Sequence, residues 1–388
     1  MTRDVAIIGQ GMTKFQEHWD RGVRELAAEA ITEALQDATI SHEQVQALFV
    51  GSMGRFGGQE HIGALVADYT GLTPIPATRV EAGCACGALA MRSAFLAVLS
   101  GLYDIVVACG VEKMTDLTDS GDLISALGAA SDQEWELQAG LTFPAVYALM
   151  ARAHMAKYGT TKEQLAMVSA KNHKNAVNNP KAHFRREFTI QQILQAKMVC
   201  APLGLLDCSP VSDGAAAIVI ADSEIAETHE CPVWIRGSGH ASDTIALQDR
   251  PTITNIPAAQ VAARKAYEYA EISPDEVDVA EIHDNFTIGE LMGLEDLGFV
   301  PEGQGGIATE AGETQIEGGK LPVNTSGGLK ARGNPIGATG IAQAIEIMLQ
   351  LRDNAGKRQV EDVEVGLTHS IGGSGATAIV TLLSSKRR

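Results

Sequence analysis

The stretch EAGCACGALA, residues 81–90, holds the side chains with the clearest chemical potential, because it places Cys84 and Cys86 one residue apart. Structural zinc sites and thioredoxin-type redox pairs separate their cysteines by at least two residues, and C-x-x-C does not occur in this sequence. We therefore expect no metal centre here. Two possibilities stay open for Cys84, a small buried core residue or a thiol activated as a nucleophile.

The residues around Cys84 predict a turn between a strand and a helix. TRVEAG before it is strand-like, and the segment after it carries Leu89, Phe95 and Leu99 at helical spacing. The dipole and free amides of a helix N-terminus lower the pKa of a nearby thiol. This position therefore favours the thiolate form of Cys84.

Three kinds of segment occur twice in the same order, which indicates two similar α/β halves. The matched pairs are residues 29–52 with 265–285, 104–110 with 364–370, and 214–221 with 375–382. Helix and strand patterns alternate in both copies, so we expect largely parallel sheets covered by helices.

About a hundred residues, 111–213, separate two strands of the first copy whose counterparts nearly touch in the second. Long insertions on α/β scaffolds commonly build binding lids, and residues 143–159 have a helical pattern. A basic stretch at 171–187 is either a solvated turn or an anion contact near a pocket.

Composition excludes several classes of function. The 388 residues are 45% hydrophobic and 20% charged, which suits a globular protein with a large core, and the formal net charge is −18. An acidic protein lacks the basic surface that nucleic acids and anionic membranes require. Six scattered cysteines form no disulfide framework and the N-terminus has no signal-like pattern, so we expect a cytoplasmic protein.

Three further segments share a glycine-rich or His-Asp pattern with the Cys84 loop. They are EIHDNFT (281–287), KARGNPIGATG (330–340) and THSIGGSG (368–375). Together with VEAGCACG they resemble the four active-site loops of the thiolase family, particularly the branch with archaeal and sterol-carrier-protein thiolases, and the resemblance covers nearly the whole chain. It implies a duplicated five-layered α-β-α-β-α fold, usually dimeric or tetrameric. Its expected parts are a first half at 1–116 with 200–225, an inserted CoA-binding loop domain at 117–199, and a second half at 226–388.

The resemblance also implies roles for single residues. Cys84 would be the nucleophile that takes the acyl group from a thioester, and its amide and that of Gly372 would cradle the oxyanion. His283 would point at the oxygen of a second acyl-CoA or its enolate. Phe286 would line the pantetheine path, and the resemblance adds Ser238 and Met150 as CoA contacts.

Two departures from the family pattern affect the acid/base chemistry. Asn334 stands where thiolases usually have a histidine that takes the nucleophile's proton; it is expected either to donate a hydrogen bond or, with Pro335, to cap a helix. Ser370 stands where thiolases usually have a second cysteine. In the sterol-carrier branch that cysteine can instead lie within H-D-C-F, and this position is Asn285 here. His283 is then the one obvious acid/base, assisted by His369 or Ser370.

The expected function is a thiolase-like acyltransferase that makes or cleaves a carbon–carbon bond in a 3-oxoacyl-CoA through an acyl-Cys84 intermediate. CoA and its esters would be substrates, with no permanently bound cofactor. Two alternatives stay open, a retro-aldolase acting on a 3-hydroxyacyl-CoA and a non-catalytic scaffold. Relatives in this branch also suggest a small partner subunit made of a zinc ribbon and an oligonucleotide-binding-type (OB-fold) barrel.

Overall fold

One nine-stranded sheet runs through the computed structural model, which describes residues 3–388. Its strand order is β3-β2-β4-β7-β1-β8-β11-β10-β9. The first-half strands are β1 (Val5–Met12), β2 (Ala47–Gly51), β3 (Ala77–Val80), β4 (Ile105–Glu112) and β7 (Gly214–Asp222). The second-half strands are β8 (Val233–Ser242), β9 (Val279–Glu281), β10 (Val365–Gly372) and β11 (Thr377–Ser384).

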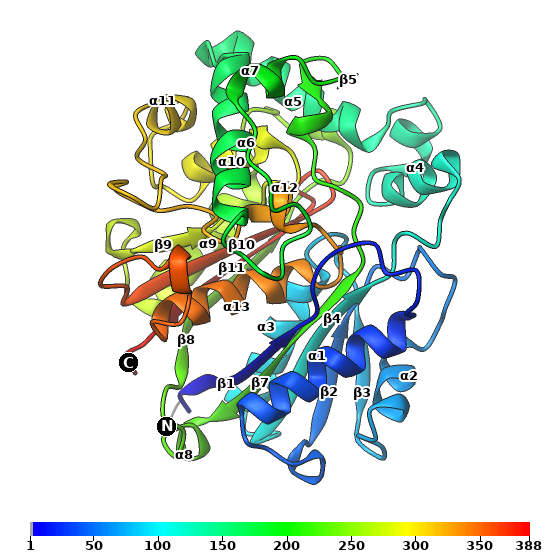
Figure 1. Cartoon of the computed structure of the whole chain (residues 1–388), viewed down its shortest axis with the longest axis vertical. Helices are drawn as coiled ribbons and strands as arrows, with labels where there is room; N and C mark the ends of the chain where they lie inside the picture. Colours follow the sequence, from blue (N-terminus) through cyan, green and yellow to red (C-terminus); the bar gives the residue numbers. More distant parts are fainter. Residues whose placement is uncertain (1–2) are drawn as a thin grey trace.

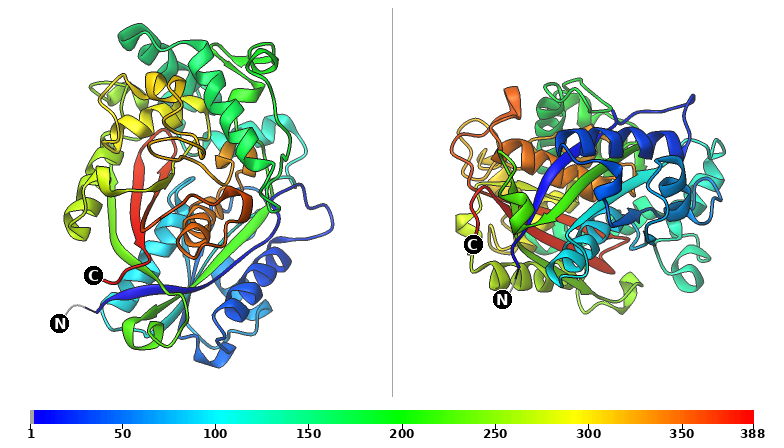
Figure 2. Two further views of the ribbon diagram at one scale, coloured as in Figure 1. Left: turned by 60° about the vertical axis from the view of Figure 1, so that its left-hand side comes forward. Right: turned by 90° about the horizontal axis from the view of Figure 1, so that it is seen from below.

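The two halves meet at a narrow seam between β1 and β8. Two residue pairs, Ala6 with Trp234 and Ile7 with Val233, join these strands. Figure 2 shows the strands of the two halves diverging from this seam, with helices between them. The sheet therefore works as two sheets, one for each half of the duplicated sequence.

The strand pairing confirms the duplication. In the first half β2 is parallel to β3 and β4, while β7 and β1 follow antiparallel. In the second half β9 is parallel to β10, β11 and β8 follow antiparallel, and Val323 takes the place of β3 through a parallel bridge to Ala280. All three repeated segments occupy equivalent positions.

The expectation of largely parallel sheets is wrong. The pairings of β1, β7, β8 and β11 are all antiparallel. The cause is visible in the second half, where the short turn between Gly372 and Thr377 can join only antiparallel neighbours. In the first half the long insertion replaces this turn, and β7 keeps the same direction.

Helices complete the expected five layers. Helix α1 (Val23–Asp37) packs on the outer face of the first half, and α9 (Pro257–Ala270) on that of the second. Between the sheets lie α3 (Cys86–Leu99) and α13 (Thr339–Leu351), in the centre of Figure 1. They approach through glycine, since a Cβ on Gly87 would lie 2.5 Å from the carbonyl oxygen of Gly337.

The inserted segment forms a helical cap, at the top of Figure 1. It contains α4 (Ser120–Gly128), α5 (Phe143–Tyr158), α6 (Lys162–Ala176), α7 (Ile190–Leu194), β5 (Met198–Cys200) and β6 (Leu203–Gly204). The other α-helices within residues 3–388 are α2 (Ile62–Tyr69), α8 (Ser223–Ala226), α10 (Thr287–Asp296), α11 (Gly305–Glu310) and α12 (Gly328–Arg332). The predicted end of the inserted domain, residue 199, falls inside strand β5 of the β5–β6 pair. The predicted domain boundaries stay a prediction.

Of the helices formed within residues 3–388, none combines the length and apolar character needed to cross a membrane.

Candidate active site

Cys84 lies in a tight turn between β3 and α3, as the sequence predicts. Gly83 opens this turn with a φ of +55°, a left-handed conformation that favours glycine. The buried thiol of Cys86 donates to the carbonyl oxygen of Gly83 and accepts from the amide of Ala82. Cys86 therefore stabilises the turn, and Cys84 is the candidate nucleophile of this loop.

A second glycine turn, Gly372–Gly373, packs directly against the Cys84 turn. A Cβ on Gly372 would lie 2.2 Å from the carbonyl oxygen of Ala82, and one on Gly83 would lie 3.1 Å from the amide nitrogen of Gly373. Side chains at these positions would push the turns apart. The Gly373 amide reaches the Cys84 thiol and lowers its pKa, and the predicted role of the Gly372 amide at the oxyanion stays a prediction.

The expected thiolate is wrong for the unliganded protein. Cys84 is 2% exposed, and burial raises the pKa of its thiol to about 12 despite the amides of Gly373 and of Cys84 itself. Desolvation disfavours the charged form, and here it outweighs the helix N-terminus. The thiol is therefore neutral at pH 7, and its proton must leave during attack on the substrate.

Glu112, at the end of β4, joins the loops beneath the nucleophile. Its buried carboxylate accepts hydrogen bonds from the amides of Met53, Gly54 and Gly337 and from the hydroxyl of Ser52, at 2.9–3.2 Å. Burial raises the pKa of Glu112 to about 7, while these donors lower it. The side chain fixes the turn that follows Asn334.

Glu112→Gln should lower the free energy of unfolding by about 1–3 kcal/mol, because the new amide would turn N–H donors toward backbone N–H groups. The raised pKa means that the folded protein holds this proton more tightly than the unfolded chain. The contribution of Glu112 to stability is thus lost as the pH rises from about 4.5 through about 7, and the variant lacks this dependence. Urea unfolding at several pH values measures both effects. Exposed Glu43→Gln is the control, and equal stability of parent and Glu112→Gln would contradict the assignment.

His283 lies in the loop between β9 and α10. It is fully buried, and neither ring nitrogen has a hydrogen-bond partner within residues 3–388. Burial, with smaller effects from His369 and Arg332, lowers the pKa of His283 to about 3. Asp284 fixes the loop by accepting from the Leu329 amide at 2.6 Å and from Asn172 Nδ2 at 2.7 Å. The imidazole is neutral and available to a ligand.

Asn334 is tethered at both ends of its amide. Nδ2 donates to the Ser209 hydroxyl at 3.2 Å, and Oδ1 accepts from the Thr339 hydroxyl at 2.8 Å. The proposed helix cap is wrong, because α13 begins at Thr339 with Ala338 as its N-cap. The backbone of Ser209 in turn donates to the carbonyl oxygen of Asn285 at 2.8 Å, which links the Asn334 turn to the His283 loop.

An aromatic wall connects these loops to the inserted segment. The Phe286 ring stacks on Tyr147 of α5 with centroids 4.6 Å apart, and Phe143 packs against both. The Tyr147 hydroxyl donates to the carbonyl oxygen of Gly373 at 2.9 Å. Cys84 belongs to the same large buried cluster, and the role of Phe286 in lining the pantetheine path stays a prediction.

The other predicted CoA contacts lie apart from this wall or inside the core. Met150 is fully buried in α5 within the cluster that contains Cys84. Ser238 lies in β8, where its hydroxyl is 3.1 Å from that of Thr381 on β11, and this placement offers no support for a CoA contact. In the basic stretch, the buried Lys171 pairs with Glu290 at 2.7 Å, so its charge is neutralised inside the protein.

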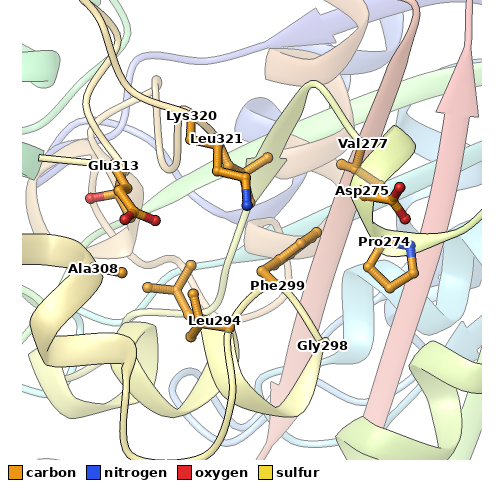
Figure 3. Close-up of a pocket in the computed structure, with 12 residues that line it drawn as sticks. Pro274, Asp275, Val277, Leu294, Gly298, Phe299, Ala308, Glu313, Lys320 and Leu321 are labelled. Carbon is orange, nitrogen blue, oxygen red and sulfur yellow. The ribbon is translucent and has the colours of Figure 1, made fainter. Parts of the chain in front are cut away.

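A cavity of about 250 Å³ lies elsewhere, between α10 and the segment at 313–321. Figure 3 shows Leu294, Phe299 and Leu321 around it, with Asp275 and Glu313 on opposite sides. None of the four loops that resemble thiolase active-site loops contributes to its lining, so this cavity is separate from the Cys84 site.

Comparison with known families decides what this arrangement belongs to. A family model described as "Thiolase, N-terminal domain" matches residues 5–224, and one described as "Thiolase C-terminal domain-like" matches residues 239–385. The chain belongs to the thiolase family. The predicted family, fold and enzyme class, an acyltransferase of the thiolase type, are confirmed.

Individual relatives lie in the predicted branch. The chain is 54% identical to an acetyl-CoA acetyltransferase of Methanothermobacter thermautotrophicus, over 98% of this chain and all of that protein. It is 35% identical to sterol carrier protein 2 of Bos taurus, over 97% of this chain and 72% of that protein. Among solved structures, "Ltp2-ChsH2(DUF35) aldolase" superposes with a TM-score of 0.87 at 29% identity, covering 99% of this chain and 98% of that chain.

The second cysteine that is usual in thiolases is replaced here by Ser370, next to His369. Ser370 directs its hydroxyl to Oε1 of Gln343 at 2.6 Å, so its proton is already engaged. His369 is buried with a pKa lowered to about 3 by burial, and lies beside Gly293 of α10. Neither replaces the second cysteine as a ready proton shuttle.

Tyr147 was not identified as a site residue from the sequence, and Asn285 was noted only because other thiolases have a cysteine at that position. Tyr147 could have been found as part of an aromatic pair, since Phe143 precedes it by one helical turn. The Tyr147 hydroxyl contacts the Gly373 turn next to Cys84. The hydrogen bonding of the Asn285 amide depends on the folded structure and has no sequence pattern.

Proposed function

We propose that the chain is a thiolase that makes or cleaves the carbon–carbon bond of a short 3-oxoacyl-CoA through an acyl-Cys84 intermediate. Two archaeal relatives, 54% and 47% identical over nearly the whole chain, are named acetyl-CoA acetyltransferases, which supports an acetyl group as the transferred acyl group. CoA and its esters are the substrates.

In the cleavage direction, the Cys84 thiol adds to the C3 carbonyl carbon while its proton leaves to a base, for which His283 is the candidate. The negative oxygen is cradled by the amides of Cys84 and Gly372. The C2–C3 bond then breaks and leaves its electron pair on the enolate of the departing acyl-CoA, whose C2 takes up the proton. The thiol of free CoA attacks acyl-Cys84 and releases the shortened acyl-CoA. Condensation reverses these steps.

The observation that carries the proposal is the contact between the two glycine turns. It places a buried, neutral thiol against backbone amides that need no reorganisation when charge develops on a thioester or ketone oxygen. Each turn comes from one half of the duplicated fold, so the site exists only where the halves meet.

The proposal is tested by incubating the protein with CoA and 3-oxoacyl-CoAs of increasing length. We expect loss of the 3-oxoacyl-CoA and formation of acetyl-CoA with an acyl-CoA two carbons shorter, measured by mass spectrometry. The likeness to an aldolase structure supports one alternative, cleavage of a 3-hydroxyacyl-CoA to a carbonyl compound and an acyl-CoA. Release of those products, with none from 3-oxoacyl-CoAs, would overturn the proposal.

Two partners are proposed on separate grounds. The edge strand β3 pairs with β2 on one side and is half-exposed, which supports a homodimer formed by pairing with the same strand of a second copy. A tetramer would need a second contact surface, because β3 pairing joins only two chains.

The similar aldolase structure carries DUF35 in its name, which supports the small zinc-ribbon and OB-fold subunit expected from the resemblance. Co-purification with such a subunit and a gain in turnover on adding it would support this second partner. Full turnover by the chain without any partner would contradict it. The predicted cytoplasmic location stays a prediction.

A further inference from the structure

The site contains two asparagines, and their amides differ in what they contact. Asn334, which the sequence predicted as a hydrogen-bond donor to substrate, has both ends of its amide occupied by Ser209 and Thr339. Asn285 is 1% exposed, and its Nδ2 forms no hydrogen bond with any group in residues 3–388. The amide available to a ligand is therefore that of Asn285.

Several contacts fix the Asn285 side chain. Its Oδ1 accepts from the backbone amide of Phe286 at 3.0 Å, and its backbone carbonyl accepts from the Ser209 amide at 2.8 Å. The adjacent Phe286 ring is stacked on Tyr147. With Oδ1 held by the backbone, the two Nδ2 protons point away from Phe286 and the amide has little freedom to turn.

The surroundings of Nδ2 lead to the nucleophile. Burial raises the pKa of Tyr147, and the Asn285 amide lies near enough to the Tyr147 hydroxyl to lower that pKa, although Nδ2 does not meet hydrogen-bond geometry with it. That hydroxyl donates to the carbonyl oxygen of Gly373, whose amide faces the Cys84 thiol. Tyr147 and Gly373 thus connect the surroundings of Asn285 to the Cys84 turn.

The same loop also contains the buried His283. Asp284, between His283 and Asn285, points the other way, toward Leu329 and Asn172. His283 and Asn285 flank Asp284 in the irregular segment between β9 and α10, and both side chains are buried. The loop thus offers a neutral imidazole and an amide nitrogen, neither with a hydrogen-bond partner within the range 3–388.

An unpaired buried amide is costly, with a desolvation penalty of about 1–3 kcal/mol, and such groups in native proteins call for an explanation. A primary amide nitrogen donates hydrogen bonds and cannot act as a base at neutral pH. The missing partner is therefore an acceptor, and in a CoA ester next to Cys84 that acceptor is a carbonyl oxygen.

We propose that Asn285 is a catalytic residue whose Nδ2 donates to the thioester oxygen of the acyl-CoA that becomes the enolate, with Tyr147 as a positioning residue. This rests on the proposed function and deepens it. The amide stabilises the negative oxygen that forms when the C2–C3 bond breaks or when a C2 proton is removed, and His283 moves that proton. Asn334 holds the loops together instead.

Asn285→Asp separates the two half-reactions. Acylation of Cys84 by acyl-CoA involves no enolate, so the adduct should form within about threefold of the parent rate. Exchange of the C2 hydrogens of acetyl-CoA with deuterated water, and cleavage of 3-oxoacyl-CoA, should fall by about a hundredfold or more at pH 8, the cost of removing one such donor. Both should recover as the pH falls, because a protonated carboxyl group can donate again.

Further variants keep the result interpretable. Asn285→Leu should show the same split without recovery at low pH. Asn175→Asp is the matched control, because Asn175 is a buried asparagine outside the site whose Nδ2 already donates to the carbonyl oxygen of Asn324. It should cost stability without separating acylation from hydrogen exchange. Tyr147→Phe should lower kcat more than it raises KM.

The outcomes distinguish this assignment from the proposed function. If the parent acylates and cleaves but Asn285→Asp and Asn285→Leu match it, or lose acylation equally, the role of Asn285 is wrong. If the parent forms no acyl-Cys84 and cleaves no 3-oxoacyl-CoA, the proposed function fails, and the assignment of Asn285 fails with it.

Discussion

Cys84→Ala should form no acyl-enzyme and should lose turnover by on the order of 10⁴-fold or more, because the variant has no atom to carry the acyl group between the two half-reactions. Intact-protein mass spectrometry after mixing with acyl-CoA or 3-oxoacyl-CoA measures the adduct directly. In the parent, peptide mapping should locate one acyl group on the peptide that contains Cys84.

Cys86→Ser is the matched control two residues away. A serine hydroxyl can donate to Gly83 and accept from Ala82 as the Cys86 thiol does, so the turn should persist and most activity with it. Turnover of a 3-oxoacyl-CoA by Cys84→Ala would remove the acyl-cysteine mechanism. Cleavage of a 3-hydroxyacyl-CoA by that variant would favour the retro-aldolase.

The duplicated fold and the four loops were predictable because their signals are local. Glycine at Gly83 and Gly372 is required by backbone conformation or by close approach, and such requirements leave a pattern in the sequence. The strand direction was not predictable from periodicity alone. Alternation of helix and strand suggested parallel sheets, but the length of the connection between Gly372 and Thr377 decides the pairing.

The ionisation and hydrogen bonding of the site were not predictable, because both depend on distant parts of the chain. The thiol of Cys84 stands at the expected turn, yet burial by several segments raises its pKa. The Asn334 Nδ2 donates to Ser209, 125 residues away in sequence, and no pattern near Asn334 predicts that hydrogen bond. The same tertiary arrangement leaves Asn285, and not Asn334, with an unused donor among the residues from 3 to 388.

His283→Ala should reduce turnover by on the order of 10³-fold or more, because His369 and Ser370 are poorly placed to replace it. The proton must leave the neutral Cys84 thiol and must later reach C2 of the enolate, and general acid–base catalysis by one positioned group is typically worth 10²–10⁴-fold. Added imidazole should restore part of the rate by entering the space left by the side chain.

His173→Ala supplies the control, since His173 of α6 is also buried and burial likewise lowers its pKa to about 3. Its removal should change stability and leave kcat close to that of the parent.

The pH profile gives an independent check on His283. Because burial lowers the pKa of His283 to about 3, the neutral imidazole persists as the pH falls and is lost only through that value. Since kcat/KM reports groups of the free enzyme, its profile in the parent should show no histidine-dependent fall near pH 6.5, the ordinary histidine value. A fall at pH 6.5 that disappears in His283→Ala would show a solvated, titrating His283. Equal turnover by parent and His283→Ala would remove it from the mechanism and leave the enolate proton to a group outside this loop.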